Sequence, residues 1–195
     1  MAINSQVDQA IQFVLNATST TVQSLTTPEN RQALVGITRL ITEAESVAFF
    51  GLGSSGIIAE YGARLFSRSG MPSYALNATG IALAEQLLAL RERHLLIMML
   101  NGRPHREAMA TITAAESLRI PIAMFLGKLD TPLRQHAAEA LILPRAKSDH
   151  VQIHAPALIA VELLHITFSS MKPKTALDSL ERLIELRTLI RPNNK

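Results

Sequence analysis

Apolar residues recur at helical spacing in the N-terminal part of the chain, before any strand-like run appears. Through residues 4–25, and again from Leu34 to Ile41, they recur with helical spacing, at Val7, Ile11, Val14, Leu15, Val22, Leu25, Leu34, Ile37, Leu40 and Ile41. Between the two groups, Thr27 precedes Pro28, a pair typical of a helix start, because the threonine oxygen can accept a backbone N–H and proline needs no donor there. The sequence therefore predicts two helices ahead of the first strand.

Short apolar runs begin at Ser46 and then alternate with helical patterns. Five runs of strand length lie at residues 46–52, 72–76, 94–100, 120–126 and 140–143. Helical patterns such as 57–69 and 107–118 separate them, and the tail is helical again over 151–170 and 173–187. Such alternation is typical of a parallel sheet with helices on both faces. We therefore predict an α/β fold with a five-stranded parallel sheet, in one structural domain made of N-terminal helices over 1–45 and a core over 46–195.

Composition narrows the class of protein. The chain has 195 residues, 48% of them hydrophobic, which is enough for one well-buried core. Its longest apolar runs are far shorter than the ~20 residues that cross a bilayer, and its N-terminus does not read as a secretory signal, so we expect a cytoplasmic protein without a membrane partner. Absence of cysteine excludes disulfides, thiolate catalysis and Cys-based zinc sites. The net charge of +3 comes from scattered Lys and Arg, which indicates a solvated surface rather than a nucleic-acid site.

A glycine turn follows the first strand. Gly51, Gly53 and Gly56 form G-x-G-x-x-G, the fingerprint of dinucleotide binding. That reading also requires an acid about 20 residues on, but "PSYALNATG" contains none and Glu85 is the next acid. A helix N-terminus binds anions, so we expect the Gly53 backbone with the Ser54 and Ser55 hydroxyls to hold a phosphate monoester. The alternative is that Ser54 only caps the helix.

These segments resemble a sugar isomerase (SIS) domain, and in particular that of RpiR-type transcriptional regulators. The resemblance runs from Pro28 through "FFGLGSSGIIAEYGARLFSRSGMPSYAL", "LIMMLNG" and "LDTPLRQHAAEALILP" to the closing "PKTALDSLERLIEL". It implies a three-layer αβα sandwich of the flavodoxin/Rossmann-like kind that binds a sugar phosphate at the strand ends, without a cofactor. It also implies a homodimer or higher homo-oligomer, in line with the apolar stripe of the first helix, which needs cover from the sheet or from a second subunit.

The loop after the third strand departs from that pattern. Family members usually carry S-x-S-G-x-T there, whereas this chain reads "MLNGRP", with Met99, Asn101 and Pro104 at the hydroxyl positions. Gly102 keeps the turn, and Asn101 and Arg103 can donate to a phosphate in place of the missing hydroxyls. His105 or Arg106 could also supply charge. The alternative is that these basic side chains are ordinary surface residues at a helix start.

An isomerase needs a base beside the sugar. The candidates are Glu85, in the helix after the second strand, and His150 and His154, four positions apart on one face of a helix expected to begin there. The two histidines also have metal-site spacing, but no third ligand accompanies them, so we predict no metal. Their alternative role is at a plain helix N-terminus near a dimer interface. The histidines at 94, 136 and 165 lie in core-like or amphipathic patterns and are expected to be structural.

Two functions therefore stay open. The first is a sugar-phosphate sensing domain of RpiR type, and the second is a stand-alone aldose–ketose isomerase. Contact with DNA is expected only through a separate helix-turn-helix domain, for which the 45 residues before the first predicted strand leave no room. The chain is then either a trimmed regulator or a free-standing relative.

Overall fold

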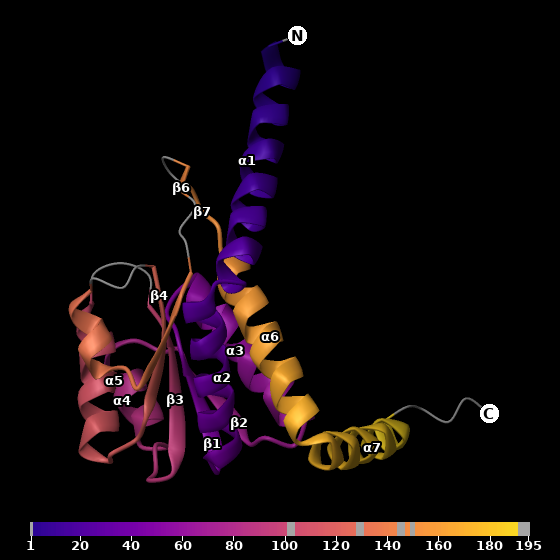
Figure 1. The fold of residues 1–195 in the computed structure, drawn as a ribbon. Coiled ribbons are helices and arrows are strands. Elements are labelled where there is room, and N and C mark those ends of the chain that lie inside the picture. The colour runs from indigo at the N-terminus through magenta and orange to yellow at the C-terminus, as the bar shows by residue number, and fades with distance from the viewer. Residues whose placement is uncertain (1, 101–103, 128–130, 144–146, 149–150, 191–195) are drawn as a thin grey trace.

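The computed structural model describes residues 2–100, 104–127, 131–143, 147–148 and 151–190. At its centre lies one parallel sheet in the order β2-β1-β3-β4-β5 (Figure 1). Its strands are β1 (Ser46–Phe50), β2 (Ser73–Leu76), β3 (His94–Met99), β4 (Ile122–Leu126) and β5 (Glu139–Ile142). All four pairings are parallel. The predicted α/β class and five-stranded parallel sheet are confirmed.

Helices cover both faces of this sheet. The described helices of the chain are α1 (Ala2–Leu25), α2 (Pro28–Glu43), α3 (Ser54–Arg68), α4 (Gly80–Leu87), α5 (Arg106–Ser117), α6 (Ala155–Met171) and α7 (Pro173–Ile190), with a short 3-10 helix η1 (Pro132–His136) before β5. Apolar side chains of α2, α3 and α6 pack with Phe49 and Ile97 on one face. Those of α4 and α5 pack with Phe50 and Met98 on the other. The result is a three-layer sandwich, and the inner strands β1, β3 and β4 are buried on both sides, as is typical of a parallel sheet.

The start of α2 fastens the N-terminal helices to the far edge of the sheet. The Thr27 side chain accepts the backbone N–H of Asn30 over 3.4 Å and Pro28 stands in the first turn, as the sequence predicted. The buried Asn30 side chain donates to the carbonyl of Ile142 over 2.8 Å and accepts the Ile142 N–H over 2.9 Å. This amide therefore satisfies the outward backbone groups of Ile142 in the edge strand β5.

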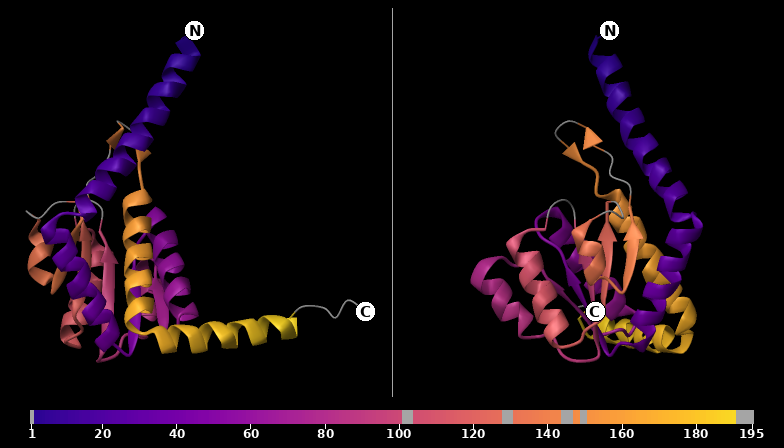
Figure 2. Two further views of the ribbon diagram at one scale, coloured as in Figure 1. Left: turned by 45° about the vertical axis from the view of Figure 1, so that its right-hand side comes forward. Right: turned by 60° about the vertical axis from the view of Figure 1, so that its left-hand side comes forward.

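Two helices project from the body of the molecule. Figures 1 and 2 show α1 rising away from the sandwich and α7 leaving it at the opposite end. In α1, Thr21 and Leu25 are buried, whereas Val7, Ile11 and Val14 are about half exposed. None of the residues of α7 is buried. The predicted apolar stripes are therefore present, but much of their area is left uncovered by this chain.

The tail begins its helix later than predicted. Instead of a helix over 151–170, the structure has two short antiparallel strands, β6 (Lys147–Ser148) and β7 (Val151–Gln152), and α6 starts at Ala155. Pro156 explains the difference, because it lacks an N–H and is tolerated only in the first turn of a helix. His154 occupies the N-cap position and His150 lies outside the described residues. The helix on which both were expected therefore begins only after His154.

Within the described residues, none of the helices is long and apolar enough to cross a membrane. The cytoplasmic location stays a prediction.

Candidate functional site

The glycine turn carries the chain from β1 directly into α3. Gly53 holds the N-cap position with φ 58° and ψ −128°, a conformation that side chains disfavour. At Gly51 space is limiting, since a Cβ there would lie 2.6 Å from the carbonyl carbon of Ser55 and nearer still to its oxygen. Helix α3 therefore begins at Ser54 without a side-chain cap. The alternative reading of Ser54 as the N-cap is wrong, and no side-chain oxygen neutralises the positive end of the α3 dipole at this cap.

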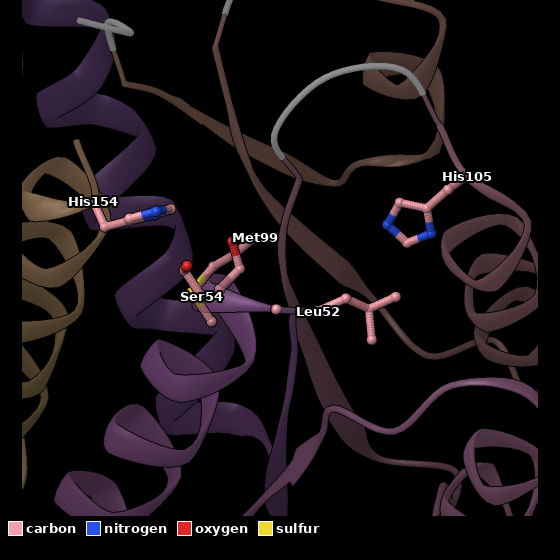
Figure 3. A pocket seen from close by; sticks show the side chains of 7 residues that line it. Leu52, Ser54, Met99, His105 and His154 are labelled. Atoms are coloured by element: carbon pink, nitrogen blue, oxygen red, sulfur yellow. The ribbon is translucent and has the colours of Figure 1, made fainter. Parts of the chain in front are cut away.

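A pocket of ≈ 350 Å³ opens over this turn, at the carboxyl edge of the sheet (Figure 3). Its described lining comes from the β1–α3 turn, the end of β3, and the starts of α5 and α6: Leu52, Gly53, Ser54, Ser55, Met99, His105 and His154. Ser54 is exposed, whereas Ser55 is 7% exposed. Ligands of open parallel sheets bind beyond the carboxyl ends of the strands, which is where this pocket lies.

Three helices begin at the pocket. Gly53 is at the N-cap of α3, His105 at that of α5 and His154 at that of α6, and all three line the cavity. Each helix N-terminus presents backbone N–H groups and about half a positive charge. None of the described lining residues is acidic. The pocket therefore collects the positive ends of three helix dipoles, although its described lining contains no Lys or Arg.

His105 and His154 reach into the pocket from opposite sides, with Ser54 between them (Figure 3). The Nδ1 atom of His105 accepts the backbone N–H of Ala108 over 3.2 Å and so caps α5. The His105 ring lies 6.1 Å from the ring of Phe50, which supports it from the sheet side. The Nδ1 atom of His154 is buried and has no hydrogen-bond partner among the described residues. Such an atom is costly to leave unpaired, which makes it available to a ligand or a water.

Comparison with known protein families identifies the family of this chain. The sequence pattern of the SIS domain matches residues 40–168, more than half of the chain. The chain belongs to the SIS domain family. This confirms the resemblance on which the sequence-based expectations drew.

Solved structures of SIS domains share the fold. The sugar isomerase domain of an RpiR transcription factor from Sphaerobacter thermophilus is 22% identical, with 90% of this chain and 98% of that chain covered at a TM-score of 0.80. Vibrio vulnificus NanR complexed with ManNAc-6P is 19% identical; the match covers 96% of this chain and 70% of NanR, with a TM-score of 0.79. Escherichia coli CFT073 c3406, also complexed with a sugar phosphate, is 20% identical; the match covers 90% of this chain and 96% of that protein, with a TM-score of 0.74. No curated protein sequence matches the chain significantly. At these identities the likeness establishes the fold.

Some of the predicted residues of this SIS domain are brought together and others are not. Gly53, Ser54, Ser55 and His154 share the pocket. Glu85 is exposed on α4 and does not belong to the described lining. The remaining candidates, Asn101, Gly102, Arg103 and His150, lie outside the described residues. Within the part of the chain that the structure describes, no cluster of three or more His, Asp or Glu side chains could hold a metal ion.

The end of β2 carries an amide network in place of the acid that a dinucleotide site requires. The side chain of Asn77 donates to Glu60 over 2.6 Å and accepts from Gln86 over 3.2 Å. Gln86 in turn accepts the backbone N–H groups of Asn77 and Ala78 over 2.9 and 3.0 Å. These bonds fix the strand end with amide side chains, and one oxygen of the Glu60 carboxylate is bonded to Asn77.

Three other histidines are engaged away from the pocket. The Nδ1 atom of His94 lies 3.0 Å from the Tyr74 hydroxyl, and burial lowers the pKa of His94 while it raises that of Tyr74 to about 12. His136 Nδ1 lies 2.7 Å from a Glu116 carboxylate oxygen. His165 Nε2 lies 2.7 Å from the Ser69 hydroxyl, and burial lowers its pKa. Each is bonded within the fold, as the sequence patterns indicated.

His105 is the lining residue that sequence reasoning placed least well. The sequence suggested it only as a possible source of charge near the second loop. Its capping role gave a weak signal, because Ser, Thr, Asp and Asn are the residues expected at an N-cap. Leu52 and Met99 could have been predicted as lining residues. Leu52 follows β1 and Met99 ends β3, and the carboxyl ends of these two parallel strands meet at one edge of the sheet.

Proposed function

We propose that this SIS domain binds a phosphosugar in the pocket and acts as a sugar-phosphate sensing domain of the RpiR type. The phosphate lies over the N-terminus of α3, on the backbone around Gly53 and the hydroxyls of Ser54 and Ser55. The observation that carries the proposal is the convergence of three helix N-termini on one cavity without an acidic side chain in its described lining. Its ≈ 350 Å³ falls within the range of small-molecule sites.

The structural relatives support a phosphorylated ligand. NanR was solved with ManNAc-6P and the Escherichia coli protein with another sugar phosphate, so the two ligands have the phosphate group in common. A helix N-terminus recognises the anionic part of such a ligand without reading the sugar. The phosphate is therefore the part of the ligand for which the pocket offers recognisable chemistry.

Sensing is favoured over turnover by the scarcity of bases. Isomerisation requires a base within hydrogen-bond reach of the sugar carbons. The titratable side chains of the described lining are His105 and His154, and the first has its Nδ1 lone pair engaged by the Ala108 N–H. Glu85 does not contribute to the described lining. The second candidate function, an aldose–ketose isomerase, would therefore rest on His154, whose buried Nδ1 has no partner among the described residues.

Calorimetry tests both functions. Hexose, pentose and amino-sugar phosphates would be titrated into the wild type, with the dephosphorylated sugars as controls. We expect one or more phosphates to bind and the neutral sugars not to bind. Equal binding of neutral and phosphorylated sugars would contradict the anion site. Conversion of the bound aldose phosphate into its ketose, followed by NMR and lost in His154→Gln, would favour the isomerase instead.

We also propose that the chain forms a homodimer through α1. Positions 7, 11, 14, 18, 21 and 25 of this helix advance in alternating steps of four and three, and the last two are buried against the same chain. Val7, Ile11 and Val14 continue that seam with 51, 50 and 47% of their surface exposed. Helix α1 has one ionisable side chain, Asp8, in 24 residues. A face so poor in charge suits the same face of a second copy, since interface cores are depleted of charge.

A further inference from the structure

A hydrogen bond at the start of α5 fixes where the neutral His105 ring carries its proton. The backbone N–H of Ala108 points at Nδ1 over 3.2 Å, so Nδ1 must offer a lone pair. In a neutral imidazole the proton then sits on Nε2. The Glu107 carboxylate lies 3.4 Å from the same Nδ1, where it would pair with a protonated ring. In the neutral ring, the bond from the Ala108 N–H favours the Nε2–H tautomer.

The remaining nitrogen faces the pocket. Figure 3 shows the His105 ring with one nitrogen turned towards α5 and the other towards the space between Ser54 and His154. Because Nδ1 is bonded to the first turn of α5, the nitrogen on the pocket side is Nε2. Contact with the Phe50 ring, whose centroid is 6.1 Å away at a 30° tilt, restricts the imidazole from the side of the sheet.

We propose that His105 is a ligand-binding residue that donates its Nε2–H to an oxygen of the bound phosphosugar while Nδ1 continues to cap α5. The inference rests on the proposed function of the pocket. It supplies a donor after β3, where Met99 and Pro104 stand at positions for which the related loop uses hydroxyls. The cap restrains the ring before the ligand arrives, so little conformational entropy is lost on binding.

A purely structural His105 would behave differently from a binding one. Serine is a strong N-cap and would keep the bond to the Ala108 N–H, but its side chain is too short to reach a ligand across the pocket. His105→Ser therefore separates the two roles. Thr27→Ala is the matched control, because it removes a side-chain cap from α2, whose N-terminus does not contribute to the described pocket lining.

The experiment uses the full chain and inorganic phosphate as the probe, followed by ¹⁵N NMR of the histidine rings and by calorimetry. In the free wild type we expect the His105 proton on Nε2, and we expect the Nε2 resonance to shift when phosphate is added. His105→Ser should weaken phosphate binding about ten-fold, the loss of one charge-assisted hydrogen bond, with little change in unfolding temperature. Thr27→Ala should lower the unfolding temperature and leave the affinity unchanged.

Several results would overturn the inference. One is a free His105 ring with its proton on Nδ1, and another is phosphate binding by His105→Ser as tight as that of the wild type. If His105→Ser does not fold, His105→Asn, which also caps, takes its place, and the wild-type resonances still decide. Failure of the wild type to bind phosphate or any sugar phosphate would overturn the proposed function together with this inference, whereas unchanged binding by the variant would overturn the inference alone.

Discussion

Gly51 and Gly53 stand two positions apart in one turn, yet the structure predicts different consequences when each is changed to alanine. A Cβ at Gly53 would meet nothing within 4 Å, so Gly53→Ala suffers only from its positive φ of 58°. Such strain costs about 1–3 kcal/mol. At Gly51 the Cβ would lie 2.6 Å from the Ser55 carbonyl carbon, where real Cβ contacts are essentially never shorter than 3.0 Å. The first turn of α3 must therefore move.

The size of that movement sets the expected effect. Overpacking against rigid backbone costs about 3 kcal/mol, which corresponds to a fall in unfolding temperature of about 6–12 °C for a chain of this length. The same shift displaces Ser54 and Ser55, so the hydroxyl and backbone donors proposed to hold the phosphate lose their alignment, and the loss of one such hydrogen bond costs about ten-fold in affinity. Gly53→Ala, whose Cβ displaces no neighbouring atom, should lower the unfolding temperature by about 2–12 °C.

Thermal unfolding and calorimetry with a bound sugar phosphate measure both effects. Gly51→Ala should be the less stable variant and should also lose most of its affinity. The reasoning is refuted if Gly51→Ala proves more stable than Gly53→Ala, or if it binds the ligand as tightly as the wild type does.

Three further predictions concern other parts of the molecule. Burial lowers the pKa of His165 below its ordinary 6.5; the Arg68 charge acts in the same direction and the Glu162 charge opposes it. The unfolded chain therefore binds the proton more readily, so the free energy of unfolding should fall as the pH drops below 6.5. In urea unfolding at pH 7 and pH 5, His165→Gln should show a smaller difference between the two pH values than the wild type does. Ile11→Asp should dissociate the proposed dimer in light scattering, whereas Val35→Asp, on an exposed position of α2, should not; a monomeric wild type at micromolar concentration would contradict the assignment. Ser54→Ala should weaken binding of a sugar phosphate about ten-fold through loss of one hydroxyl donor, and unchanged affinity in calorimetry would argue against phosphate at this turn.

The sheet and the glycine turn were predictable because local rules determine them. Apolar runs of strand length that alternate with helical patterns allow few arrangements other than a covered parallel sheet. The spacing of Gly51 and Gly53 reports the tight entry into α3 that the structure displays. Thr27 and Pro28 marked the start of α2 for the same local reason.

The features that sequence reasoning missed depend on competition between signals or on distant contacts. The apolar pattern after residue 150 suggested a helix, but Pro156 delays it to Ala155 and leaves His154 at the N-cap. The bond from the Ala108 N–H to His105 is local, but histidine is not a residue expected at an N-cap, and no local pattern encodes the approach of α6 across the pocket. The stripe on α1 was recognised, but a stripe alone does not say what covers it.

The assignment of the anion to the N-terminus of α3 is tested most directly by locating bound phosphate on the backbone. Amide ¹H–¹⁵N shifts would be followed by NMR as inorganic phosphate, and then the sugar phosphate that binds best, is titrated into the chain. The account predicts that the largest and saturable shifts fall on the amides of Gly53, Ser54 and Ser55, with smaller ones at the starts of α5 and α6. Saturable shifts centred on residues outside the pocket, with Gly53 to Ser55 unmoved, would contradict it.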